Sequence, residues 1–171
     1  MRTEMNVTDC VNQSLSLLSD SVKARFANSP LDALTSELGL TVSAVNHLTD
    51  ARSDGGTCDG MSFLDDGVIL YAPTRDSRRE NFTLAHELGH WLAEQAEDVY
   101  DWIADQEEPG RLLETVCDRI AQELLLPKQS LKATIGKGFI RAQHVLELYE
   151  RTQASKPACA IALATCLPGL G

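Results

Sequence analysis

The stretch ENFTLAHELGHWLAEQ, residues 80–95, decides the fold, because it joins a helical pattern to two histidines four residues apart. Apolar residues recur at positions 82, 84, 85, 88, 91 and 92, which is the spacing of one face of an α-helix. Ser77 and Glu80 have capping-box spacing, so we expect the helix to begin near Ser77. On such a helix His86 and His90 project from the same face.

Two imidazoles at this spacing suit two ligands of a tetrahedral zinc ion. Glu87 follows the first histidine, so it can reach a zinc-activated water and accept its proton without binding the ion. Gly89 leaves no side chain between the two ligands, which lets another segment pack closely. The alternative is an amphipathic helix that happens to hold two histidines. Chance gives this motif on the order of once in a hundred or more such chains, so the metal site is favoured.

A third ligand is needed, and two solutions are common. The histidine-based extension requires glycine and histidine at positions 93 and 96, but both are alanine here, so that class is excluded. Glu114 and Asp118 lie four residues apart in a later helical stretch. Glu114 can supply the third ligand, and Asp118 can accept the free N–H of a ligand histidine. The alternative for this pair is a solvated acidic face beside Arg111 and Arg119, and spacing alone leaves both open.

The rest of the chain predicts an α+β fold, because helices come first, a few strands follow, and helices return. Asp66-Gly67 is typical of a hairpin turn between two short strands. Helices are predicted over 11–27, Pro30–Gly39, 77–92, 111–126, 138–153 and 157–166, with a helical turn at 128–134. A strand is predicted at 40–48, a loop at 49–60 and two short strands within 61–72.

The composition and charge of the chain exclude some classes of function. The formal net charge of −10 disfavours a direct nucleic-acid partner, although residues 127–171 are net basic. The chain has no apolar run of transmembrane length and no signal-peptide core, so no membrane association and a cytoplasmic location are predicted. Its five cysteines are odd in number and scattered, which favours reduced thiols.

Two motifs in order resemble the ImmA/IrrE family of zinc metallopeptidases. Members typically read F-T-x-A-H-E-L-G-H and then E-x-x-A-N/D-x-F-A-x-x-L-L-x-P. This chain reads FTLAHELGH from residue 82 and ETVCDRIAQELLLP from residue 114. Cys117 replaces the usual alanine and Ile120 the usual phenylalanine. The hairpin before the histidine helix also fits, so the resemblance covers roughly residues 30–165.

The resemblance implies a small zincin-like metallopeptidase domain, with helices around a short twisted β-sheet. It implies zinc as the cofactor, His86, His90 and Glu114 as its ligands, and Glu87 as general base. It implies a basic helix-turn-helix repressor as substrate, in a stress, phage or mobile-element response. We expect a single domain over 1–171, with a helical extension at 1–29, a catalytic core at 30–127 and C-terminal helices at 128–171. Many relatives continue into a sensor-like domain, so the chain is either truncated before one or a natural short form.

Substrate-binding features are predicted around this core. An extended peptide would add to a sheet edge, for which Val68–Tyr71 is the candidate, with core packing as the alternative. An acidic run at 94–108 would favour a basic substrate if it rims the cleft, and is otherwise a solvated loop. Candidates for the oxyanion stabiliser are Tyr71, Tyr100, His144 and Tyr149.

Two further hypotheses remain open. The helix pair at 138–166 on the basic tail is typical of a helix-turn-helix, which would make the chain a non-catalytic regulatory or DNA-binding module. Against this, PACAIALATC has few polar side chains and is typical of a buried helix. Separately, Cys58 lies in a glycine-rich loop and could occupy the fourth zinc position as a regulatory thiol.

Overall fold

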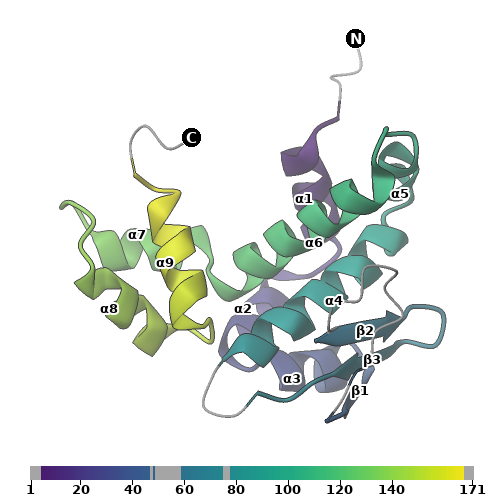
Figure 1. Ribbon diagram of the computed structural model, residues 1–171, viewed down its shortest axis with the longest axis horizontal. Coiled ribbons are helices and arrows are strands. Elements are labelled where there is room, and N and C mark those ends of the chain that lie inside the picture. The colour runs from purple at the N-terminus through teal and green to yellow at the C-terminus, as the bar shows by residue number, and fades with distance from the viewer. Residues whose placement is uncertain (1–4, 47, 49–58, 75–77, 168–171) are drawn as a thin grey trace.

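The computed structural model describes residues 5–46, 48, 59–74 and 78–167 (Figure 1). Within these residues the elements follow the predicted order of helices, strands and helices, which confirms the α+β class. The elements are α1 Val7–Ser16, α2 Asp20–Asn28, α3 Pro30–Asp32, a π-helical segment Ala33–Glu37, β1 Thr41–Ala44, β2 Gly60–Phe63, β3 Val68–Tyr71, α4 Arg79–Gln95, α5 Glu97–Ala104, α6 Pro109–Leu125, α7 Lys128–Ile135, α8 Gln143–Arg151 and α9 Lys156–Ala164.

The three described strands form one mixed sheet in the order β1-β3-β2. β3 pairs parallel with β1 and antiparallel with β2 along its whole length. Gly67 closes the β2–β3 hairpin with φ of 62°, as the Asp66-Gly67 dipeptide predicts. The prediction that Val68–Tyr71 is a free edge is wrong, because both of its sides are hydrogen-bonded to neighbouring strands. Among the described strands, β1 and β2 are the edges.

α4 and α6 lie side by side and antiparallel through the middle of the molecule (Figure 1). Leu84, Leu88 and Leu92 form the buried stripe of α4, as its helical periodicity predicts. Burial of each such side chain stabilises the fold by about 1.5–3 kcal/mol. A Cβ added at Gly89 would lie 3.0 Å from the Cα of Cys117, so the two helices meet almost backbone to backbone. This close approach fixes the distance between the side chains that the two helices present beside it.

The N-terminal part differs from its prediction in one respect. A single helix over 11–27 was expected, but the structure has α1 and α2 separated by a break at residues 17–19. Ser19 caps α2, because its hydroxyl accepts a hydrogen bond from the N–H of Val22 at 3.3 Å. The cap restarts the helix in a new direction, which helical periodicity alone does not reveal.

The start of α4 also differs in detail. Ser77, the predicted cap, lies outside the described residues. The carboxylate of Glu80 accepts a hydrogen bond from the N–H of Thr74 at 2.9 Å, and the Thr74 hydroxyl accepts one from the N–H of Glu80 at 3.2 Å. This reciprocal pair ties the end of the sheet segment to the first turn of α4.

α7, α8 and α9 gather at one end of the molecule, beyond the end of α6 (Figure 1). The prediction that the last helix is buried is correct for only one of its faces. Cys159, Ala162 and Leu163 are buried, whereas Ile161 is 62% exposed. In the part of the chain that the structure describes, no helix has both the length and the apolar character to cross a membrane.

Candidate metal centre

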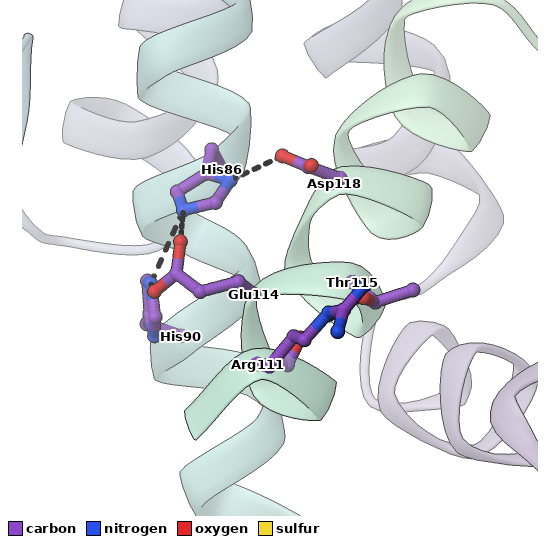
Figure 2. Close-up of polar contacts among 6 residues, drawn as sticks. All are labelled: His86, His90, Arg111, Glu114, Thr115 and Asp118. Atoms are coloured by element: carbon purple, nitrogen blue, oxygen red, sulfur yellow. Dashed lines mark hydrogen bonds and ion pairs between the residues drawn. The ribbon is translucent and has the colours of Figure 1, made fainter. Parts of the chain in front are cut away.

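Three side chains from α4 and α6 converge on one point (Figure 2). The Nε2 atoms of His86 and His90 lie 3.2 Å apart. Oε2 of Glu114 lies 3.3 Å from Nε2 of His86, and its Oε1 lies 3.4 Å from Nε2 of His90. The structure thus brings together the three residues that the sequence proposes as ligands.

The separations fit a tetrahedral metal ion. Zinc bonds of about 2.0–2.2 Å to nitrogen and oxygen place ligand atoms of a tetrahedron about 3.3–3.6 Å apart. The ligand atoms of His86, His90 and Glu114 lie 3.2–3.4 Å apart in these three pairs. Two imidazoles and one carboxylate also form the donor set of many catalytic zinc sites, which leave one position open. The residues present therefore fit a zinc ion.

Asp118 holds the first histidine in place. Its Oδ1 lies 2.9 Å from Nδ1 of His86, one helical turn along α6 from Glu114 (Figure 2). If Nδ1 carries the proton and donates to Asp118, the Nε2 lone pair faces the other two ligands. A carboxylate in this position fixes the tautomer and orientation of a metal-binding imidazole.

The same carboxylates shift the titration of the site. Burial lowers the pKa of His86, but hydrogen bonds to Asp118 and Glu114 and the charges of Glu114 and Glu87 together raise it to about 9. Hydrogen bonds to His86 and His90 hold the pKa of Glu114 well below its usual range. Glu114 is therefore ionised at neutral pH, and a metal ion must displace a proton from His86 to bind there.

Glu87 lies between α4 and the sheet. It is 7% exposed, and the edge strand β2 crosses directly over it. A Cβ added at Gly60, the first residue of β2, would lie 2.5 Å from Cγ2 of Thr83 and 2.8 Å from Oε1 of Glu87. The sequence interpretation missed Gly60, although a glycine at the start of a strand is typical of a close backbone approach.

Cys117 belongs to the helix contact and not to the ligand set. It is fully buried against Gly89. Burial, together with the charges of Glu114, Glu87 and Asp118, raises the pKa of its thiol well above the usual range. The protonated thiol is a poor metal ligand, so Cys117 serves packing, as its small size predicts.

The remaining candidates come from other parts of the chain. Tyr100 is on α5, and Nδ1 of His144 accepts a hydrogen bond from the N–H of Arg141 on the far group of helices. Within the described residues no contact joins either side chain to the ligands. Tyr71 is on β3 and Tyr149 is on α8. Cys58 lies outside the described residues.

Two comparisons with known proteins give the family of the chain. The family model described as the IrrE N-terminal-like domain, a peptidase family, matches residues 37–163. The radiation response metalloprotease IrrE of Deinococcus radiodurans is 29% identical over 127 residues, covering 67% of this chain and 39% of that protein. Its namesake in Deinococcus deserti is 30% identical over 112 residues, covering 64% of this chain and 40% of that protein.

The chain thus spans about two-fifths of the length of these curated relatives. The family match includes β2 and β3, both ligand-bearing helices and most of the C-terminal group of helices. It also confirms the resemblance that the two sequence motifs indicate. This chain belongs to the peptidase family of the IrrE N-terminal-like domain.

Proposed function

We propose that this chain is a zinc-dependent endopeptidase, with His86, His90 and Glu114 as zinc ligands and Glu87 as general base. One observation carries the proposal: the three candidate ligand atoms lie within 4.8 Å of one another, and Glu87 directly follows His86 on the same helix. Family membership supports the reaction class. The structural alternative, two unrelated histidines on an amphipathic helix, does not account for the converging carboxylate of Glu114.

Zinc bound by these residues would act as a Lewis acid, lowering the pKa of water and polarising the scissile carbonyl. Glu87 accepts the proton of the attacking water and then delivers it to the leaving amine. Its burial under β2 keeps the carboxylate on the reacting side of α4. Asp118 acts through His86, whose orientation it maintains by the 2.9 Å contact to Nδ1.

The substrate would lie extended along the outer edge of β2. This strand has β3 on one side, and it is the strand that passes over Glu87. A peptide that adds to a sheet edge gains main-chain hydrogen bonds and presents alternate side chains to the enzyme. We therefore move the predicted peptide edge from Val68–Tyr71 to Gly60–Phe63.

Membership of a peptidase family implies a protein substrate. We propose that this substrate is a basic helix-turn-helix repressor. The acidic run at 94–108 supports this, because most of its carboxylates are exposed on and around α5. The relatives named radiation response metalloproteases favour a stress setting over phage or mobile-element responses. The charge and the scattered thiols are consistent with a cytoplasmic protein.

The DNA-binding alternative receives less support. α8 and α9 do pack against each other, as a helix-turn-helix pair would. However, apart from Lys156 at its first position, the exposed residues of α9 are Pro157, Ala160, Ile161 and Ala164, and none of these four can hydrogen-bond a base edge through its side chain.

The test combines metal content with hydrolysis. Mass spectrometry of the purified protein should find one zinc per chain, lost in His90→Ala and Glu114→Ala. Glu87→Gln should keep its zinc but cleave a pool of peptides from unfolded proteins at least about 100-fold more slowly than wild type. Normal turnover in Glu87→Gln would refute the mechanism. A wild-type protein that takes up no zinc would refute the metal site.

A further inference from the structure

A pocket of about 730 Å³ opens beside the metal centre, between the first turn of α4, the second half of α6 and the start of α9. Its apolar lining includes Phe82, Leu125, Pro157 and Ile161. This volume lies in the range of pockets that hold small ligands or large side chains.

The pocket adjoins the ligand cluster. Asp118 lines it and also contacts Nδ1 of His86 at 2.9 Å. Phe82 lines it as well, one turn before His86, with 6.5 Å between the two ring centroids. A chain held at the metal centre would therefore need to extend only a short way to place a side chain in the pocket.

The pocket is cationic, on a protein whose net charge is −10. Arg78, Arg119 and Lys156 line it and make no ion pair with any described carboxylate. Arg78 donates hydrogen bonds to the carbonyl oxygens of Tyr149 and Thr152, and its Cζ lies 4.0 Å from the ring centre of Tyr149. The Nζ of Lys156 lies 5.1 Å from the same ring centre.

Held in this way, Arg78 is a fixed positive charge. Lys156 and Arg119 are exposed. Arg119 donates one long hydrogen bond, 3.5 Å, to the hydroxyl of Thr8, which a ligand carboxylate can replace. Arg79 also lines the pocket and pairs with Asp59 at 2.7 Å. Asp118 is an acidic lining residue already engaged by His86. The unpaired lining charge is thus positive, next to an apolar wall.

We propose that this pocket is a specificity site for the substrate peptide. It takes a large apolar side chain and pairs Lys156 and Arg119 with an adjacent Asp or Glu. The inference rests on the proposed peptidase function and deepens it by naming a substrate feature. The pocket would favour an acidic substrate residue at one end of the α4–α6 pair. The acidic α5 region, which lies where α4 ends and α6 begins, would favour a basic residue at the other end.

The test measures binding of capped dipeptides to zinc-loaded, isotope-labelled Glu87→Gln protein by amide NMR. The probes are acetyl-Phe-Asp-amide, its neutral isostere acetyl-Phe-Asn-amide, and acetyl-Ala-Asp-amide. The first should shift the amide signals of Phe82, Ala158 and Ile161. It should bind about three- to fivefold more tightly than the neutral isostere, the range of a solvent-exposed ion pair.

Two variants separate the charge from the apolar wall. Lys156→Glu should reverse the preference between the Asp and Asn probes, and Ile161→Ser should weaken both phenylalanine probes alike. Both positions are exposed, so folding is preserved. Lys137→Glu is the matched control, because Lys137 is exposed and lies outside the pocket lining, and its affinities should equal those of the parent.

Equal affinity for the Asp and Asn probes, or signals that shift elsewhere on the protein, would overturn the proposal. Hydrolysis is a separate readout and addresses the peptidase function alone. A protein that binds the Asp probe in the pocket but cleaves no peptide would refute the peptidase and retain the peptide pocket. An active peptidase without the charge preference would refute the pocket.

Discussion

Gly60 and Glu87 show how one absent side chain positions the carboxylate that we propose as general base. The edge strand can cross α4 at this point only because residue 60 has no Cβ. The atoms that such a Cβ would meet are the γ-methyl of Thr83 and a carboxylate oxygen of Glu87. Glu87 is therefore held between a helix and a strand, and its reach toward a bound substrate is set by their separation.

Gly60→Ala should lower the rate of peptide cleavage by about 10- to 100-fold while zinc content stays at the wild-type level. The added methyl displaces Glu87 but none of the three ligands, and small misplacements of a catalytic group have effects of this size. Gly110→Ala is the control, because a Cβ there meets nothing within 4 Å. A Gly60→Ala enzyme as fast as that control would contradict the positioning role.

The proton on His86 predicts how metal binding depends on pH. Its pKa in the metal-free protein is raised to about 9, so the side chain is protonated at neutral pH and must lose that proton to bind zinc. Apparent zinc affinity should rise by about tenfold per pH unit between about 7 and 9 and then level off. Calorimetry in two buffers of different ionisation enthalpy measures the proton released. A pH-independent affinity over this range would rule out the linkage.

At the scale of elements, the metal centre is a property of the α4–α6 pair. α4 supplies two of the proposed ligands, and α6 supplies the third together with Asp118. The site therefore exists only when the helices pack at one separation and register. Gly89 and Cys117 set that separation. A change at this contact should therefore affect stability and metal affinity together.

Gly89→Ala should destabilise the metal-free protein by about 1–3 kcal/mol and weaken zinc binding, because the new Cβ meets backbone atoms of α6 that cannot rotate away. Denaturant unfolding of the metal-free protein measures the first effect, and competition with a chelator measures the second. The control Gly110→Ala, also on a helix, should neither destabilise the metal-free protein nor weaken zinc binding, because a Cβ there meets nothing within 4 Å and alanine favours the helix. Unchanged unfolding and zinc affinity in Gly89→Ala would show that the helices have room to separate.

For the whole molecule, zinc should act as a cross-link between the two central helices. A ligand that binds only the folded state at about 100 times its dissociation constant adds about 2.7 kcal/mol of stability. For a chain of this size, that raises the thermal midpoint by about 5–10 °C. Thermal unfolding with zinc and with a chelator measures the shift. It should vanish in His90→Ala, and an equal shift in that variant would place the stabilising metal elsewhere.

Features that depend on residues close together in the chain could be predicted from the sequence. Helical periodicity placed α4 and α6, Asp66-Gly67 placed the hairpin, and His86, Glu87 and His90 needed only one helical turn to be brought together. Such features follow from local backbone geometry, which the sequence encodes directly. Spacing alone left Glu114 open between a metal ligand and a solvated acidic face, and the resemblance of the second motif to a metallopeptidase family favoured the ligand.

Features made by residues distant in sequence could not be predicted and became clear from the packing of the elements. β3 is the centre of the sheet because β1 pairs with it from the side opposite the hairpin, which alternation within a strand cannot reveal. The contact of Gly60 with Glu87, and the pocket that α9 completes beside α4 and α6, join residues 27 to 83 positions apart. Their contacts depend on how whole elements pack, and that packing is set by the shared core and not by any one segment.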